Sequence, residues 1–332
     1  MKVLVTGGSS LLARRTAEEL IRRGDEVVCF QRRRAKIDTT QILGDIRDRA
    51  LVATAAKGCD AIIHAAAKVG VVGRWEDYRS INVDGTAAVI AAARQHGALR
   101  VVHVSTPSVA HAGHALVGAA ATPPVTGRRG AFYAESKAIG ERLAVAASSD
   151  QMVVVAIRPH LVWGPLDTQL VGRIVERARA GRLALVGSGA ALVDTTYIDC
   201  AASALVAALD AALPGARCVG RAYVIANGEP RPIRELVLGI CRAAGIDVVP
   251  HEVPRRVALA TGSAVERVWQ IAARLGRRTS EPPLTRFLAE QLGTAHWFDP
   301  RPARDDLDWV PTVSIDDGLE RLAEWYENGC CA

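Results

Sequence analysis

The sequence is poor in lysine, and it has no paired-cysteine motif and no long apolar run. Only five of its 41 basic residues are Lys, and the Arg residues are scattered along the chain instead of forming one stripe. A nucleic-acid-binding protein concentrates its basic residues on one face. The net charge of +6 therefore indicates a mildly basic, solvated surface, and no nucleic-acid partner is expected.

The seven cysteines include no C-x-x-C pair, and most of them lie in apolar stretches. This pattern is typical of buried thiols in a reducing compartment, and no metal site is expected. The apolar start at 3–5 runs directly into the polar turn at 6–8, so we expect no signal peptide. No stretch is long and charge-free enough to span a bilayer. These features predict a cytoplasmic protein.

Strand and helix patterns alternate through the first half of the chain. Apolar runs predict strands at 2–6, 26–30, 41–44, 61–65, 100–105 and 153–157, and helical periodicity predicts helices at 11–22, 48–56, 76–96 and 131–147. Such alternation predicts an α/β fold with a doubly wound parallel Rossmann sheet that helices cover on both faces. We expect residues 1–160 to form a dinucleotide-binding domain.

After residue 160 the pattern loosens, and Gly and Pro signals recur. Helices are predicted at 168–180, 198–212, 232–244, 256–275, 284–293 and 315–327. We expect residues 161–332 to add a late strand to the sheet and to form a smaller C-terminal substrate-binding lobe, with a ligand cleft between the two. Residues 253–292 space their apolar side chains at helical intervals. That face suits an acyl or sterol cleft, peripheral contact with a membrane, or ordinary core packing.

The first predicted strand is followed by a turn with the sequence Thr6-Gly7-Gly8-Ser9-Ser10-Leu11-Leu12-Ala13. A dinucleotide-binding turn usually has glycines where this chain has Gly7, Ser10 and Ala13. Ala13 affects only helix–strand packing, whereas Ser10 stands where glycine lets the backbone approach the phosphates. Gly8 and a serine hydroxyl offer compensation. A plain turn with a helix cap is the alternative.

The second predicted strand ends at Gln31 and Arg32, without the acid that holds the ribose 2′-hydroxyl in NAD-selective sites. Gln31 does not repel a 2′-phosphate, and the run from Arg32 through Arg33 to Arg34 offers charge to bind one. NADP(H) is therefore expected in preference to NAD(H), unless these Arg residues are merely solvated. Asp45 either closes the adenine pocket or caps a helix.

Tyr133 and Lys137 lie four residues apart on a predicted helix, which puts both on one face. An ammonium beside a phenol lowers the phenol pKa from its ordinary value near 10. Such a pair exchanges a proton with a carbonyl oxygen while hydride moves to or from carbon. A predicted strand ends at Ser105 and Thr106. We expect Thr106, with Ser105 second, to be the catalytic hydroxyl; strand-end capping is the alternative.

In the order and spacing of its motifs the chain resembles the extended short-chain dehydrogenase/reductases. The motifs are the turn at 6–13, Gly44-Asp45-Ile46, His64-Ala65-Ala66-Ala67, Asn82-Val83-Asp84-Gly85-Thr86, residues 104–109, the Tyr-x-x-x-Lys pair, residues 158–165 and Tyr197-Ile198-Asp199. Within that group residues 66–78, 281–287 and 296–299 resemble the 3β-hydroxysteroid dehydrogenase branch. They are most similar to the 2-alkyl-3-oxoalkanoate reductases of olefin and β-lactone biosynthesis.

The resemblance implies that Thr106 is the catalytic hydroxyl, Tyr133 the acid/base and Lys137 the ribose-binding partner. It implies reduction of a 3-oxo group on a large apolar substrate, and a homodimer formed through the helices near 80–96 and 131–147. The alternatives are a 3β-hydroxysteroid dehydrogenase, a nucleotide-sugar epimerase or dehydratase, and a non-enzymatic NADP(H) sensor. The expected cofactor-binding residues are Gly7, Ser9, Ser10, Leu11, Leu12, Gln31, Arg32, Arg33, Asp45, Ile46, Ala65, Ala66, Ala67, Lys137, Pro159, His160 and Val162.

Overall fold

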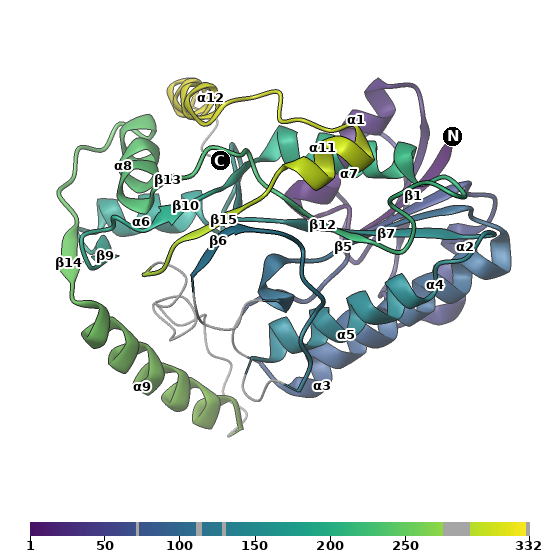
Figure 1. Ribbon diagram of the computed structural model, residues 1–332, viewed down its shortest axis with the longest axis horizontal. Coiled ribbons are helices and arrows are strands. Elements are labelled where there is room, and N and C mark those ends of the chain that lie inside the picture. The colour runs from purple at the N-terminus through teal and green to yellow at the C-terminus, as the bar shows by residue number, and fades with distance from the viewer. Residues whose placement is uncertain (71–72, 111–114, 128–130, 275–292, 330–332) are drawn as a thin grey trace.

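The centre of the computed structural model is a seven-stranded parallel sheet with the strand order β12-β7-β5-β4-β1-β2-β3 (Figure 1). The structure describes residues 1–70, 73–110, 115–127, 131–274 and 293–329. The strands are β1 (Lys2–Thr6), β2 (Glu26–Gln31), β3 (Thr40–Leu43), β4 (Ala61–His64), β5 (Arg100–Val104), β7 (Val153–Pro159) and β12 (Ala222–Ile225). The expected doubly wound parallel sheet is confirmed, and its order reverses between β1 and β4.

Helices cover both faces of this sheet. On one face lie α2 (Arg49–Ala56), α4 (Gly85–His96) and α5 (Phe132–Ala146), and on the other lie α1 (Leu11–Arg22) and α7 (Ile198–Ala211) (Figure 1). Successive strand residues point to opposite faces. Val3 and Val5 therefore pack under α1 and α7, whereas Leu4 packs with the core on the α2 side. Full burial of such aliphatic side chains stabilises the fold by about 1.5 to 3 kcal/mol each.

The helix predicted at 76–96 is divided in the structure. It begins as α3 (Trp75–Tyr78), continues as a π-helical turn over Arg79–Asp84, and becomes α4 at Gly85. A left-handed Gly97, with φ of 71°, ends α4. Inserted π turns occur frequently at functional sites, and this one places Asn82 in the protein interior.

A second, four-stranded sheet has the order β13-β10-β15-β6. Its short strands are β6 (Leu116–Ala119), β10 (Leu192–Val193), β13 (Arg231–Pro232) and β15 (His296–Phe298). Beside it α8 (Ile233–Ala243) packs against α6 (Val171–Arg179) and α12 (Ile315–Glu327). The remaining named elements are η2 (Pro107–Val109), β8 (Val162–Trp163), β9 (Ala184–Val186), β11 (Thr196–Tyr197), β14 (His251–Val253), α9 (Arg255–Arg274) and α11 (Arg301–Leu307).

The late strand that the sequence predicts is β12, which returns the chain to the central sheet beside β7. The division into a domain of residues 1–160 and a lobe of residues 161–332 stays a prediction. The strand β12 and the helix α7 both belong to the second segment by sequence, but they pack on the central sheet.

The helix α9 confirms most of the helix predicted at 256–275, and the helix predicted at 284–293 lies almost wholly outside the described residues. In α9, Val257 and Val268 are 51% and 58% exposed, whereas Ala258 is buried beside Val186. Within the described ranges, no helix combines the length and the apolar character needed to cross a bilayer.

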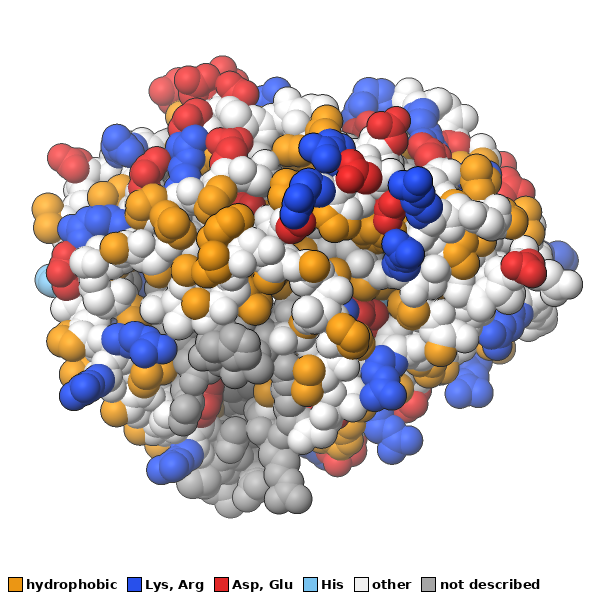
Figure 2. Space-filling model, in the orientation of Figure 1, with side chains coloured by type: hydrophobic (Ala, Val, Ile, Leu, Met, Phe, Trp, Pro, Cys, Tyr) orange, Lys and Arg blue, Asp and Glu red, His pale blue; other side chains and the backbone are white. Residues whose placement is uncertain are grey.

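Charges of both signs are interspersed on the surface, as expected from the sequence. Figure 2 shows basic and acidic side chains alternating over one face of the molecule. Several form surface ion pairs, such as Arg231 with Asp316 at 2.6 Å and Arg15 with Asp199 at 2.5 Å. Exposed pairs of this kind contribute little to stability because water and salt screen them.

Candidate active site

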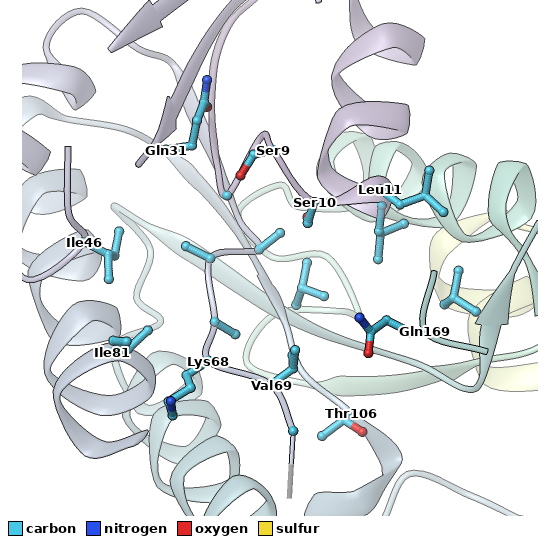
Figure 3. A pocket seen from close by; sticks show the side chains of 18 of the residues that line it. Ser9, Ser10, Leu11, Gln31, Ile46, Lys68, Val69, Ile81, Thr106 and Gln169 are labelled. Carbon is cyan, nitrogen blue, oxygen red and sulfur yellow. The ribbon is translucent and has the colours of Figure 1, made fainter. Parts of the chain in front are cut away.

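A cleft of about 870 Å³ opens at the carboxyl ends of the central strands (Figure 3). Its wall follows the turn after β1, the end of β2 and the segments after β4 and β5. Residues in and just before α6 and at the start of α7 form the opposite wall. Open α/β sheets bind ligands where the strand order reverses, and this cleft lies beside the reversal between β1 and β4.

The structure brings most of the expected site residues together in this cleft. Thr106, Tyr133, Lys137 and Ser105 all line it. The expected cofactor-binding residues that also line it are Gly7, Ser9, Ser10, Leu11, Leu12, Gln31, Arg32, Asp45, Ile46, Ala65, Ala66, Ala67, Pro159 and Val162.

Two expected cofactor-binding residues do not line the cleft. Arg33 is exposed outside it. His160 is buried, because its Nδ1 donates to the carbonyl oxygen of Asp194 at 2.6 Å and its ring packs edge-on against Phe298. The His160 side chain joins the central sheet to the four-stranded sheet, and the expected contact of His160 with the cofactor stays a prediction.

The turn after β1 passes very close to the segment after β4. Gly7 has φ of +78°, and a Cβ there would lie 2.9 Å from the backbone of Ala66. Only glycine fits both constraints. Ser10 has φ of −80° and needs no glycine; it begins α1 as an N-cap, and its hydroxyl accepts from the Ala13 amide at 3.4 Å. The amino end of α1 faces the cleft, as an anion-binding helix start does.

The end of β2 carries a buried amide oxygen with no hydrogen-bond partner in the described part of the chain. The orientation of the Gln41 amide group is defined by its partners, because its Nε2 donates to the carbonyls of Ala35 and Ile37. Gln41 Oε1 therefore accepts from Gln31 Nε2 at 2.8 Å. This leaves Gln31 Oε1 buried near Gly8, with no partner among the described residues.

Asp45, at the same end of the cleft, is already paired. Its carboxylate accepts two hydrogen bonds from the Arg47 side chain, at 2.8 and 2.7 Å. These bonds, assisted by Arg32, lower the pKa of Asp45 to about 2. Asp45 therefore stays ionised and does not act as a proton donor at neutral pH.

A chain of buried hydrogen bonds runs beneath the cleft through His64. Thr6 Oγ1 accepts from the Ala66 amide at 3.2 Å and contacts His64 Nδ1 at 2.8 Å. His64 Nε2 lies 3.1 Å from Thr86 Oγ1, which donates to the Asn82 carbonyl. Burial, with the positive charge of Lys137, lowers the pKa of His64 to about 3. His64 is therefore a neutral structural link and not an acid–base group.

Asn82 joins α5, the helix that carries Tyr133 and Lys137, to the segment after β4. Its Oδ1 accepts from the Lys68 amide at 2.7 Å, and its Nδ2 donates to the Lys68 carbonyl and to Ser136 Oγ at 3.0 and 2.9 Å. Ser136 in turn donates to the carbonyl of Tyr133. A Cβ at Gly140 would lie 2.4 Å from the Asn82 carbonyl oxygen, so α5 can approach the π-helical turn only with glycine there.

Tyr133 and Thr106 both line the cleft, and the Thr106 hydroxyl lies close enough to the tyrosine side chain to affect its pKa. Burial raises the pKa of Tyr133, although the Thr106 hydroxyl opposes the rise. The expectation of a lowered phenol pKa therefore does not hold here, because burial outweighs the effect of Thr106. Tyr133 keeps its proton at neutral pH and can act as a proton donor.

Lys137 lies one helical turn beyond Tyr133 and is only 4% exposed. Its Nζ donates to the carbonyl of Val104 at 2.5 Å, which ties α5 to the end of β5. Burial lowers the pKa of Lys137 to about 8, although Glu141 opposes the fall. Both oxygens of Glu141 accept from the buried Arg158, which itself donates to the Thr122 carbonyl.

Ser105 precedes Thr106 and is buried at the same strand end. Its amide donates to the Ile157 carbonyl at 2.6 Å, and its Oγ has no partner within the described part of the chain. Thr106 instead caps the short helix after it, where its Oγ1 accepts from the Ser108 amide at 3.3 Å. The two hydroxyls thus differ: Thr106 contacts Tyr133, and Ser105 keeps unused hydrogen-bonding capacity.

Several cleft residues were missed by sequence reasoning. Asp167, Gln169 and Arg173 come from the region of α6, which no motif places near the turn. Lys68 follows directly after Ala67 and is one of five lysines, so its position offered a usable signal. The others are Phe30, Gly44, Val69, Gly70, Ile81, Val104 and Ile198.

Comparison with known proteins identifies the family. Residues 3–226 match the model of the NAD dependent epimerase/dehydratase family. A 2-alkyl-3-oxoalkanoate reductase of Stenotrophomonas maltophilia (strain K279a) is 47% identical, over 97% of this chain and 98% of that protein. A 3-beta-hydroxysteroid dehydrogenase of Mycolicibacterium neoaurum is 30% identical, over 98% of this chain and 91% of that protein.

Solved structures with the same fold include nucleotide-sugar enzymes. The structure of a UDP-glucuronic acid 4-epimerase from Bacillus cereus in complex with NAD superposes with a TM-score of 0.75 and 19% identity, and 99% of each chain is covered. This likeness confirms the Rossmann architecture. The chain therefore belongs to the NAD dependent epimerase/dehydratase family of extended short-chain dehydrogenase/reductases, and is an NAD(P)-dependent oxidoreductase.

Proposed function

We propose that this protein reduces the ketone of a 2-alkyl-3-oxoalkanoate to a secondary alcohol. The observation that carries the proposal is the convergence of Thr106, Tyr133 and Lys137 on one cleft, which also contains the turn of Gly7. The relative that is 47% identical bears the name of this activity and matches almost end to end. A tyrosine that keeps its proton suits the reductive direction, because the carbonyl oxygen must receive one.

The cleft fits a dinucleotide. The turn at Gly7 passes close to the Ala66 backbone, the amino end of α1 opens onto the cleft, and Gln31 and Arg32 line its far end. We infer that Lys137 binds the ribose hydroxyls of the nicotinamide half and that Pro159 and Val162 border the ring. When bound, the reduced cofactor supplies the hydride.

The chain's own groups handle the oxygen. Thr106 and Tyr133 hold the ketone oxygen by hydrogen bonds, and the Ser105 hydroxyl is a further donor. Tyr133 donates its proton to that oxygen as the carbonyl carbon receives hydride, so that C=O becomes CH–OH. The ammonium of Lys137 stabilises the phenolate that remains until solvent returns a proton.

We infer that NADP(H) is preferred over NAD(H), and that the preference depends on Arg32. Arg32 lines the cleft beside Gln31, whereas Arg33 and Arg34 are exposed outside it. The neutral Gln31 does not repel a 2′-phosphate, and an Arg guanidinium binds one through charge-assisted hydrogen bonds.

A substrate panel tests the proposed reaction. Purified protein would be given a 2-alkyl-3-oxo acid, a 3-oxosteroid and a UDP-sugar, each with NADPH and with NADH, while cofactor absorbance and products are followed. We expect turnover of the oxo acid, with NADPH better than NADH. Turnover confined to the steroid or conversion of the UDP-sugar would overturn the proposal, and cofactor binding without turnover of any ketone would indicate a sensor.

We propose a homodimer formed through α4 and α5, in the cytoplasm, on the strength of the family resemblance. Sedimentation of the intact protein tests the dimer.

We also propose peripheral contact of α9 with an anionic membrane, because exposed Val257 and Val268 lie on a helix that carries Arg255 and Arg256. Flotation with anionic vesicles tests that contact.

A further inference from the structure

The cleft carries more positive than negative charge along its length. Its acidic lining residues are Asp45 and Asp167, and the carboxylates of both already accept hydrogen bonds from the protein. Asp45 is bound by Arg47, and the Asp167 carboxylate accepts three backbone N–H groups of residues 169–171 at 2.8 to 3.0 Å. The basic lining residues are Arg32, Lys68, Lys137 and Arg173. Such a cleft attracts anionic ligands.

Three of these cations already have a place in the site. Arg32 lies at the end of β2, beside Gln31. Lys137 is buried and donates to the Val104 carbonyl. Arg173 donates to Gln169 Oε1 at 3.2 Å on the wall that faces α1. Lys68 remains, and nothing in the proposed reduction uses its ammonium.

The backbone of Lys68 is fixed by two hydrogen bonds, whereas its ammonium lies over an aromatic ring. Asn82 binds both the amide and the carbonyl of Lys68. The side chain is half-buried, with Nζ 5.1 Å from the ring centroid of Tyr78, and none of the described carboxylates forms an ion pair with it. A cation–π contact holds an ammonium without neutralising its charge.

Lys68 lies at the end of the cleft that holds Thr106 and Tyr133, which we call the catalytic end. The ammonium of Lys68 lies over the Tyr78 ring, whose centroid is 6.4 Å from the centroid of the Phe132 ring. Phe132 directly precedes Tyr133. Figure 3 shows Lys68 and Thr106 on either side of Val69, at the end of the cleft away from Gln31. The long, flexible stem of lysine lets the ammonium turn toward a ligand bound beside Val69.

We propose that Lys68 binds the carboxylate of the 3-oxo acid and thereby orients the ketone toward Thr106 and Tyr133. The inference rests on the proposed function. In a 3-oxo acid a single carbon separates the ketone carbon from the carboxylate carbon. A cation beside the group that holds the ketone oxygen is therefore what this substrate requires, and a steroid or a neutral ketone has no carboxylate to use it.

The test compares an acid with its ester. A 2-alkyl-3-hydroxyalkanoic acid and its methyl ester would be oxidised with NADP⁺, because the hydroxy acid does not decarboxylate as an oxo acid does. We expect Lys68→Met to lower kcat/KM about 10- to 100-fold for the acid, as loss of a charge-assisted hydrogen bond does, and to leave the ester within about twofold. Lys68→Arg keeps the charge and should restore most of the activity on the acid.

Arg32→Met is the matched control, since it removes a cation from the other end of the same cleft. It should change the rates on acid and ester by the same factor. Equal losses on acid and ester in Lys68→Met, or an acid-selective loss in Arg32→Met as large as that in Lys68→Met, would overturn the role of Lys68. A wild-type protein that oxidises neither compound would instead overturn the proposed function itself. Thermal unfolding of each variant tests whether the fold is retained, and we expect that it is, because Asn82 binds the backbone of Lys68 and not its side chain.

Discussion

The two ends of the cleft are built differently. At the catalytic end the groups are buried and tied together: Lys137 to the Val104 carbonyl, and Asn82 to Lys68 and Ser136. At the other end, around Gln31, we propose that the adenosine half of the cofactor binds, and we call it the adenosine end. There Arg32 is exposed, and Asp45 is paired with Arg47 at the surface. Burial at the first end shifts pKa values and fixes geometry, whereas the second end offers exposed charge. We infer that changes at the catalytic end affect turnover or the stability of the fold, and that changes at the adenosine end affect the choice of cofactor.

The largest expected separation of the two ends comes from Lys137→Met. This variant removes the ammonium that stabilises the Tyr133 phenolate, and we expect turnover to fall by about 10²-fold or more. Because the wild-type charge is buried at a cost, the melting temperature should not fall. Steady-state kinetics and thermal unfolding measure the two effects. A large loss of stability with unchanged turnover would place Lys137 among structural residues only.

The pH dependence of the wild type is the companion measurement. Burial lowers the Lys137 pKa to about 8, so the ammonium is lost as the pH rises above that value and activity should decline there. Stability should change in the opposite sense. Between pH of about 8 and about 10.5 the unfolded chain binds a proton at this position that the folded chain does not, so this group's contribution to folding becomes more favourable as pH rises. Lys137→Met should lack both effects.

Asn82→Leu should break the catalytic end without touching the adenosine end. It leaves the amide and carbonyl of Lys68 without their partner and removes the bond to Ser136. We expect the free energy of unfolding to fall by about 2 to 4 kcal/mol, measured in urea. Ser136→Ala removes a smaller part of the network and should cost about 1 kcal/mol. Equal stability of Asn82→Leu and the wild type would show that α5 does not depend on this contact.

Arg32→Ala should sharpen the contrast from the other side. Removing the guanidinium should weaken NADPH binding about tenfold and leave NADH binding nearly unchanged, because only NADPH carries the 2′-phosphate. The melting temperature should stay the same, since Arg32 is exposed. Fluorescence titration with both cofactors measures the effect. A parallel loss for NADPH and NADH would mean that Arg32 does not read the 2′-phosphate.

The smallest expected effect is that of Ser10→Gly, which restores the usual glycine to the phosphate turn. Ser10 already has an ordinary backbone conformation and caps α1. We expect a loss of a few tenths of a kcal/mol in stability and little change in NADPH affinity. A large gain in affinity would show that the serine side chain obstructs the phosphates. Urea unfolding and cofactor titration together distinguish these results.

Sequence reasoning succeeded where local patterns decide structure. The first strand and helix have the predicted bounds, 2–6 and 11–22, because an apolar run and a helical period are separated by glycine. It could not show that the helix predicted at 76–96 contains a π turn, since one widened turn barely changes the apolar period. It also missed the four-stranded sheet, whose strands of two to four residues form only when segments as distant as 116–119 and 296–298 meet.

The same limit applies to the site. Motif spacing predicted Tyr133, Lys137 and Thr106, because the functional groups sit on regular elements that the motif identifies. Gln169 and Arg173 were missed, since their approach to the cleft depends on how α6 packs. The buried position of the His160 side chain was not predicted either, because spacing does not say which way a side chain points at the end of a strand.

The most direct test is the single-turnover rate of Tyr133→Phe with saturating NADPH and a 2-alkyl-3-oxo acid, beside the wild type. Phenylalanine keeps the ring and removes only the hydroxyl that donates the proton. We expect the rate to fall by about 10²- to 10⁴-fold, with NADPH affinity and melting temperature unchanged. A rate within about threefold of the wild type would contradict the assignment of Tyr133 as the proton donor of this cleft.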